Sequence, residues 1–233
     1  MGDPRVFGPP ARHAMRGCRV MSRVCVMGGS RGIGLATVKA LLERGHEVTA
    51  FSRSAERLDL HHDRLTCVSG DAHNRGDVER AVSGQDAVVQ ALGVALNLKL
   101  LTGPITLFSQ ATQVLVPVLE DAGVKRLVAV TGFGAGDSAR AISSLQRVPF
   151  RIVFGHAYAD KSRQEAIIKA SSLDWTIVRP GVLTNQPLRK PYRIRMVPSD
   201  WRNGIISRAA VADYIANVLF DPAARHSEPV LAN

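Results

Sequence analysis

The sequence of 233 residues lacks several features that would each identify a class of protein. No apolar run approaches the length that crosses a bilayer, so we expect no membrane partner. The three cysteines have no CxxC spacing and His61-His62 stands without further ligands nearby, so we also expect no metal site. Cys25 and Cys67 fall in expected interior strands, where we interpret them as small buried side chains. This cysteine usage favours a reducing compartment, and we predict a cytoplasmic protein.

The formal net charge is +10, but the sequence lacks the patterns by which basic proteins recognise nucleic acids. The basic residues are scattered, aromatic residues do not alternate with them, and zinc-finger spacing is absent. A local basic cluster at residues 189–195 is either a solvated strand or a contact for an acidic substrate. We therefore expect a small-molecule partner rather than nucleic acid, bound by a monomer or a weak homo-oligomer.

Residues 1–22 differ in composition from the rest of the chain. They contain four arginines, three prolines and one acidic residue, without sustained apolar periodicity or the apolar core of a secretory signal. We expect a disordered basic N-terminal extension over residues 1–22 and a single domain over residues 23–233.

The most informative segment is the glycine-rich heptapeptide at residues 28–34. Residues 23–27 before it read as a buried strand, and apolar residues recur at helical spacing from Ile33 onward. A strand that turns through glycines into a helix presents free backbone N–H groups and a positive dipole end to one point. Such an arrangement binds a pyrophosphate, so the segment predicts a dinucleotide site.

The next expected strand, residues 46–51, ends at Ser52 and Arg53. In a dinucleotide site this strand end contacts the adenosine ribose. An acidic residue there accepts from the 2′-OH of NAD, whereas an arginine suits the 2′-phosphate of NADP. Because Arg53 holds this position and Arg31 offers a second guanidinium, we predict that NADP(H) is preferred over NAD(H).

Strands and helices alternate along the remaining sequence. We expect strands at residues 65–69, 86–90, 125–131 and 174–179, and helices at residues 74–82, 105–122, 160–170 and from Ser207. Asp160 and Ser207 are expected to cap two helices, and Pro117 to kink or restart another. The predicted fold class is α/β, a doubly wound parallel sheet (Rossmann fold) in a single domain with a small C-terminal substrate-side region.

Taken together, these segments resemble the short-chain dehydrogenase/reductase superfamily. Within it, the chain is similar to the atypical branch of NAD(P)H-binding proteins that includes NmrA-like regulators and biliverdin-IXβ (flavin) reductases. The resemblance covers about residues 22–232. It is carried by residues 28–34, 69–71, 123–131, 175–181 and 206–213, and by Asp160-Lys161 with Glu165.

The resemblance implies where a dinucleotide would lie. Residues 71–72 would meet the adenine, residues 91–93 the ribose and phosphates, and residues 180–183 the nicotinamide, while residues 183–197 would border the substrate. The implied cofactor contacts are Gly28, Ser30, Arg31, Gly32, Ile33, Gly34, Ser52, Arg53, Asp71, Ala72, Ala91, Leu92, Gly93, Thr131, Lys161, Pro180, Gly181, Val182 and Leu183.

The chain departs from the conventional members of the superfamily at their catalytic positions. Those members carry a Ser just past the fifth strand and a Tyr four residues before a Lys, and the Tyr donates a proton to the substrate carbonyl. Lys161 matches the Lys, but Ala157 stands four residues before it and Tyr158 is one place off. The Ser position holds Gly132, next to Thr131. We take Lys161, Thr131 and Tyr158 as the candidate catalytic residues.

Two functions remain open. The chain is either an NADP(H)-dependent oxidoreductase that transfers hydride to a flavin-like or other small conjugated or carbonyl acceptor, or a non-catalytic NADP(H)-sensing regulator of the NmrA-like kind that acts through a protein partner. Hydride transfer to a conjugated acceptor needs less acid catalysis, because the cofactor supplies the hydride and solvent supplies the proton. We favour the enzyme.

Overall fold

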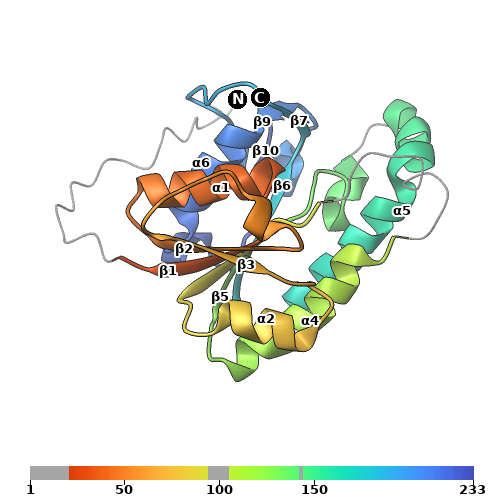
Figure 1. Ribbon diagram of the computed structural model, residues 1–233. Coiled ribbons are helices and arrows are strands. Elements are labelled where there is room, and N and C mark those ends of the chain that lie inside the picture. The colour runs from red at the N-terminus through yellow and green to blue at the C-terminus, as the bar shows by residue number, and fades with distance from the viewer. Residues whose placement is uncertain (1–20, 94–104, 142–143) are drawn as a thin grey trace.

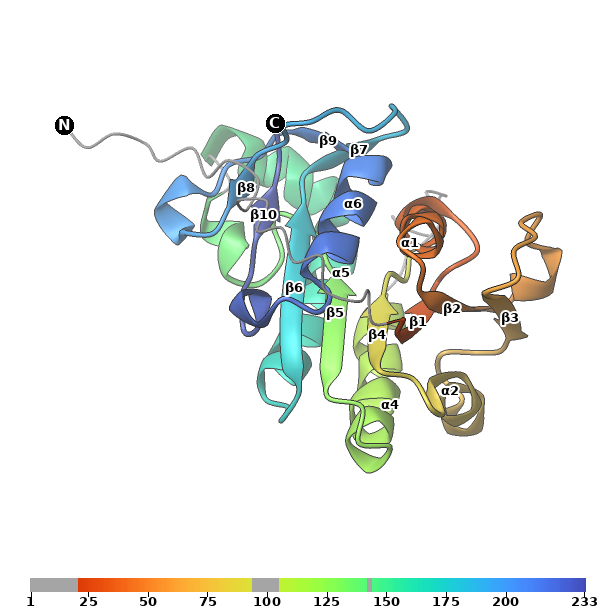
Figure 2. The ribbon, with the colours of Figure 1, turned by 90° about the vertical axis from the view of Figure 1, so that its left-hand side faces the viewer.

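The structure, a computed structural model, describes residues 21–93, 105–141 and 144–233. Its centre is a sheet of eight strands in the order β3-β2-β1-β4-β5-β6-β10-β8 (Figures 1 and 2). All neighbouring strands are parallel except β10 and β8. This order confirms the doubly wound Rossmann fold. The strands are β1 (Arg23–Met27), β2 (Glu47–Ser52), β3 (Leu65–Ser69), β4 (Ala87–Gln90), β5 (Arg126–Val130), β6 (Asp174–Pro180), β8 (Ile194–Arg195) and β10 (Val230–Leu231).

Helices cover both faces of the sheet. The helices are α1 (Gly32–Glu43), α2 (Arg75–Val82), α4 (Leu107–Asp121), α5 (Ser144–Lys169) and α6 (Arg208–Val218), with 3₁₀ turns η1 (Ala55–Arg57), η2 (Gly136–Ala141), η3 (Pro198–Asp200) and η4 (Pro222–Ala224). Val24 and Val26 of β1 pack with α1 and α6, whereas Cys25 and Met27 pack with α2 and α4. Alternate residues of one strand therefore enter two different cores, which is why the strand is apolar throughout.

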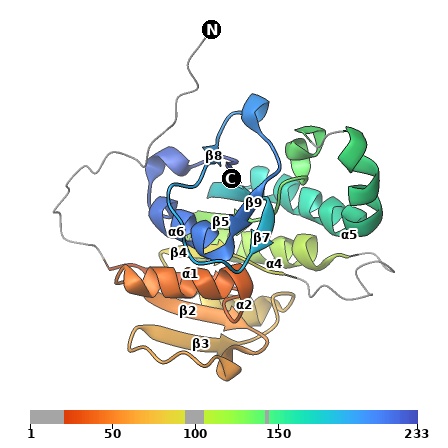
Figure 3. The ribbon, with the colours of Figure 1, turned by 90° about the horizontal axis from the view of Figure 1, so that it is seen from above.

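A small two-stranded sheet lies beside the main one, formed by β7 (Val182–Thr184) and β9 (Ile205–Ser207). Seen from above, β7 and β9 lie between α1 and α5 (Figure 3). This pair forms part of the predicted C-terminal substrate-side region. It brings the segment after β6 next to the start of α6.

Two predictions about burial and helix limits were wrong. Cys67 is exposed, because β3 is an edge strand that pairs only with β2 among the described residues, whereas Cys25 is fully buried as expected. Helix α5 begins at Ser144, so Asp160 is not its N-cap. Asp160 is buried within α5 and caps α4 instead, since its Oδ2 accepts from the backbone N–H of Phe108 at 2.8 Å.

The predicted cap of α6 is confirmed, and one of the two alternatives for Pro117 is excluded. Ser207 caps α6, accepting from the N–H of Ala210 at 3.1 Å. Helix α4 continues through Pro117 as one element, so the proline does not restart it. The predicted extension over residues 1–22 lies almost wholly outside the described residues.

Candidate functional site

The glycine loop has backbone geometry that side chains would obstruct. Gly28 and Gly32 have φ values of +85° and +60°, a region that favours glycine. A Cβ on Gly28 would lie 2.6 Å from the carbonyl oxygen of Ala91, and one on Gly34 would strike the carbonyl oxygen of Gly28. The loop therefore packs tightly against the end of β4 and against its own helix, as the sequence predicted.

The start of α1 is open to a ligand. Arg31 precedes the helix without making a side-chain capping bond, and the first turn holds no acidic residue. The first turns of α2 and α6, in contrast, are capped by Asn74 and Ser207. The positive end of α1 thus has no anionic partner among the described residues, which fits it to a phosphate.

The ends of β2, β3 and β4 bring more of the predicted cofactor residues to the same edge of the sheet. Arg53, directly after β2, is exposed, and its charge helps to lower the pKa of Asp71 after β3. The largest cause of that lowering is the bond from the backbone N–H of His73 to the Asp71 carboxylate, 3.0 Å long. Arg31 reaches across to the end of β4, where it donates to the carbonyl oxygen of Gly93 at 3.4 Å.

Arg208 is a residue beside the glycine loop that the sequence reasoning missed. It is the first residue of α6, and its Nε lies 3.9 Å from the position of a Cβ on Gly32, the first residue of α1. Its Nη1 donates to Oδ1 of Asn185 at 2.7 Å. A signal was present, because Arg208 lies within the segment 206–213 that carries the family resemblance, directly after the capping Ser207.

The residues predicted to lie near the nicotinamide and the substrate follow β6. Pro180 is buried at the end of the strand, and Val182 and Leu183 open β7, where Val182 is 55% exposed. A Cβ on Gly181 would strike the carbonyl oxygen of Gly204. Glycine at 181 therefore permits the close approach of the two segments that carry β7 and β9.

Lys161 lies on α5 and points toward the end of β5. Its Nζ donates to the carbonyl oxygen of Thr131 at 2.5 Å and lies 5.0 Å from the ring centroid of Phe108. Burial lowers the pKa of Lys161 to about 8, and the negative charge of Glu165 opposes this shift. A pKa of about 8 leaves the group mostly as an ammonium at pH 7.

Tyr158 lies beside Lys161 in spite of its shifted position in the sequence. The Nζ of Lys161 is 5.5 Å from the Tyr158 ring centroid, because residues three apart share a helix face. A Cβ on Gly132 would lie 2.9 Å from the Tyr158 hydroxyl. The phenol therefore lies next to the position where conventional members carry the serine side chain. Burial raises the pKa of Tyr158 to about 12.

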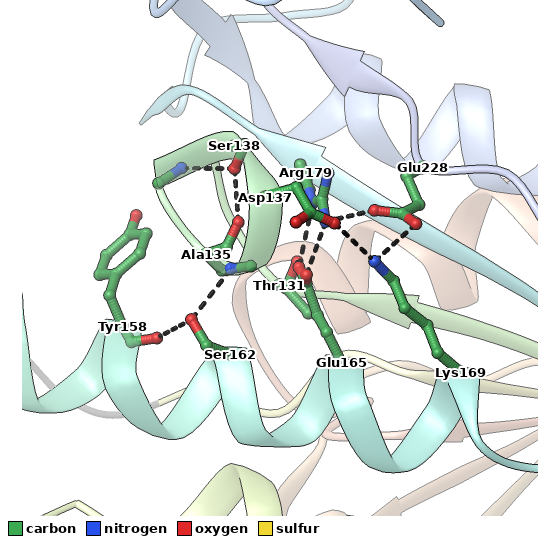
Figure 4. A network of polar contacts seen from close by, with 12 residues as sticks. Thr131, Ala135, Asp137, Ser138, Tyr158, Ser162, Glu165, Lys169, Arg179 and Glu228 are labelled. Atoms are coloured by element: carbon green, nitrogen blue, oxygen red, sulfur yellow. Dashed lines mark hydrogen bonds and ion pairs between the residues drawn. The ribbon is translucent and has the colours of Figure 1, made fainter. Parts of the chain in front are cut away.

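Thr131 presents two oxygens in two directions. Its carbonyl accepts from Lys161, whereas its hydroxyl donates to Oε1 of the buried Glu165 at 2.7 Å (Figure 4). Glu165 in turn forms an ion pair with Arg179, which the sequence reasoning did not single out. The catalytic candidates Lys161, Thr131 and Tyr158 thus come together at one strand end, with a buried ion pair behind them.

Comparison with known families shows the family to which the chain belongs. A model described as NAD(P)H-binding matches residues 28–222, from the glycine loop to beyond α6. The chain belongs to this NAD(P)H-binding family. The match covers every site residue named above, and it confirms the predicted family at this level.

Curated relatives of this NAD(P)H-binding protein cover it to different extents. An uncharacterized chloroplastic protein of Arabidopsis thaliana is 30% identical over 203 residues, covering 84% of this chain and 71% of the relative. A 3-beta-hydroxysteroid dehydrogenase of Mycolicibacterium neoaurum is 37% identical over 115 residues, or 46% of this chain. The chain spans only 31% of that dehydrogenase and 26% of an ipsdienol dehydrogenase of Ips pini.

Solved structures share the fold of this family member. The anaerobilin reductase ChuY of Escherichia coli O157:H7 has a TM-score of 0.74 at 23% identity, covering 91% of this chain and 97% of its own. A short-chain dehydrogenase/reductase of Veillonella parvula, solved in complex with NADP, has a TM-score of 0.76 at 19% identity, with coverages of 91% and 94%.

Among residues 21–93, 105–141 and 144–233, no group of three or more His, Cys, Asp or Glu side chains is arranged to hold a metal ion. In the same ranges, no helix has the length and apolar character needed to cross a membrane.

Proposed function

We propose that this NAD(P)H-binding protein is an NADP(H)-dependent oxidoreductase that transfers hydride to a small conjugated or carbonyl acceptor, such as a flavin. The observation that carries the proposal is the pairing of Lys161 with Tyr158 beside Gly132, at the same sheet edge as the glycine loop. The reductase named among the solved structures and the dehydrogenases among the relatives support the reaction class.

The described residues fit a phosphorylated dinucleotide. Arg31 and Arg208 lie beside the start of α1 and Arg53 lies at the end of β2, and none of them forms an ion pair with a carboxylate within the described ranges. Together with the uncapped start of α1 they would hold the pyrophosphate and the 2′-phosphate, so we assign NADP(H) over NAD(H). The remaining proposed cofactor contacts are those named from the sequence.

The proposed chemistry divides between cofactor and protein. A bound nicotinamide supplies the hydride. Tyr158 would donate a proton to the acceptor, and the Lys161 ammonium beside it would stabilise the phenolate that remains. The side-chain hydroxyl of Thr131 is directed to Glu165, so we assign Thr131 a role through its carbonyl oxygen, which orients Lys161.

The experiment measures NADPH oxidation by the purified chain with FMN, biliverdin and quinones as acceptors, and in parallel the affinity for NADPH. We expect turnover with at least one acceptor, and its loss in Lys161→Met. Tight NADPH binding without turnover on any acceptor would instead favour the sensor, a function consistent with the displaced tyrosine.

The location and oligomeric state stay predictions (cytoplasmic, monomer or weak homo-oligomer), and two of the Arabidopsis relatives are chloroplastic proteins.

A further inference from the structure

A series of linked ion pairs begins next to Thr131 and continues to the protein surface. Oε1 of Glu165 accepts from the Thr131 hydroxyl at 2.7 Å and from Nε of Arg179 at 3.0 Å, while Oε2 pairs with Nη2 of Arg179 at 2.6 Å (Figure 4). Arg179 also pairs with Glu228, whose other oxygen lies 2.7 Å from Nζ of Lys169. We call these residues, with Asp137 at the far end, the charge network.

The two ends of the charge network differ in burial. Glu165 and Arg179 are 1% and 0% exposed, and the Arg179 guanidinium lies 4.8 Å from the ring centroid of Trp201. At the other end, the Lys169 side chain is 29% exposed and pairs with the exposed Asp137 at 3.1 Å. The inner end is therefore fixed in a low-dielectric interior, where an ion pair holds its geometry strongly, and the outer end is screened by water.

The inner end is connected to Lys161 through one residue. Thr131 gives its hydroxyl to Glu165 and its carbonyl oxygen to the Lys161 ammonium. The loop after Thr131 also packs on the ion pair, since a Cβ on Gly136 would lie 2.9 Å from Nη2 of Arg179 and would strike Oε2 of Glu165. A shift of Glu165 would consequently move the strand end to which Lys161 is bonded.

We propose that Glu165 is a positioning residue for Lys161, acting through its charge on the Lys161 ammonium and through its hydrogen bond to Thr131, and held in place by Arg179. The inference rests on the proposed function for its meaning in catalysis. A purely structural ion pair would stabilise the fold without affecting the lysine. The two roles differ in what they do to the Lys161 ammonium, which is the quantity to measure.

Few charged or titratable groups face Lys161 in the described residues. Helix α5 contributes Glu165 and Tyr158, whereas β5 contributes the Thr131 carbonyl and α4 the Phe108 ring. Asp160 neighbours Lys161 in sequence but directs its carboxylate to the backbone of α4. Since the charge of Glu165 raises the pKa of Lys161 against burial, removal of that charge should lower the pKa further.

The first test follows the titration of Lys161 by carbon-13 NMR of its ε-carbon in the full chain without cofactor, with the signal assigned through Lys161→Met. In Glu165→Gln we expect the titration to move to lower pH by about one unit. The matched control is Lys169→Met, which removes a charge at the outer end of the charge network and should leave the Lys161 titration in place. A Lys161 titration that is the same in Glu165→Gln and in the unaltered chain overturns the proposal.

The second test isolates the hydrogen bond from the charge. Thr131→Val removes the hydroxyl and keeps the ion pair, and we expect NADPH oxidation to fall about tenfold in kcat with little change in the KM for NADPH. Thr131→Ser keeps a hydroxyl and should restore most of the rate. Equal rates in Thr131→Val and the unaltered chain contradict the positioning role. If the unaltered chain oxidises no NADPH, the proposed function fails, while the NMR titration still decides whether Glu165 acts on Lys161.

Discussion

Arginines buried in the fold and arginines beside the predicted cofactor site have opposite surroundings in this protein. Arg126 and Arg179 are 7% and 0% exposed, and the chain itself supplies their partners. Arg126 donates to the carbonyl oxygen of Leu219 at 2.5 Å, just past the C-terminal end of α6, and Arg179 pairs with two carboxylates. Arg31, just before α1, and Arg53, just after β2, in contrast form no carboxylate pair in the part of the chain that the structure describes.

The difference distinguishes arginines needed for the fold from arginines that we propose to bind a ligand. A guanidinium is charged at all physiological pH values and requires acceptors wherever it is buried. Arginines whose acceptors come from the chain are needed for the fold, whereas those that keep unused donors beside the predicted cofactor site are available to an external anion. Substitution should therefore reduce stability in the first group and ligand affinity in the second.

The largest expected effect is on stability. Arg179→Met leaves the buried Glu165 without its cation and leaves Glu228 paired with Lys169 alone, and we expect it to lower the free energy of unfolding by about 3–5 kcal/mol. Urea unfolding followed by circular dichroism measures the loss. The control is Arg57→Met at the exposed turn η1, which should change the free energy by less than about 0.5 kcal/mol. Similar losses in both variants would show that burial does not distinguish the arginines.

Cofactor choice provides the next effect. Arg53→Ala removes the guanidinium that we assign to the 2′-phosphate, so the affinity for NADPH should fall about tenfold or more while that for NADH stays within about twofold. Fluorescence titration with both cofactors gives the ratio, and Arg57→Ala again serves as the control. An unchanged NADPH/NADH ratio would remove Arg53 from the site.

The sequence predicted most of what lies along the strands. The six parallel strands β1 to β6, the glycine loop and the strand-end position of Arg53 follow from apolar periodicity and local turn chemistry. It predicted less well what depends on partners distant in the chain. Asp160 reads as a helix cap from its neighbours, but only the packing of α5 against α4 shows that it caps the other helix.

The sequence also did not predict which strand lies at the sheet edge or which charged side chains are buried together. Cys67 lies in a strand of ordinary apolar pattern, and its exposure results from the place of β3 in the strand order. Arg179 lies in an apolar strand, but nothing local indicates that Glu165 and Glu228 converge on it. Tyr158 was recognised as displaced, whereas its return beside Gly132 required the helix geometry.

Lys161, unlike the buried arginines, is a cation whose charged form is destabilised by burial. Its folded pKa of about 8 lies below the unfolded value, so below pH 8 the folded state carries a desolvated ammonium, and this cost disappears as the pH rises toward the unfolded pKa. We expect Lys161→Met to raise the free energy of unfolding by roughly 1 kcal/mol at pH 7, with a smaller gain at pH 10 and with loss of NADPH oxidation. Urea unfolding at the two pH values measures both terms, and a destabilised variant at pH 7 would contradict the argument.

Arg208 should give the smallest and least specific effect. Its guanidinium adjoins Gly32 at the start of α1, so we expect it to meet the pyrophosphate that NADPH and NADH share. Arg208→Ala should weaken both cofactors alike, by about fivefold, and leave their ratio unchanged. Arg208→Lys, which keeps the charge without the forked geometry, should recover part of the loss. A change confined to NADPH would place Arg208 at the 2′-phosphate beside Arg53, and its assignment to the pyrophosphate would be wrong.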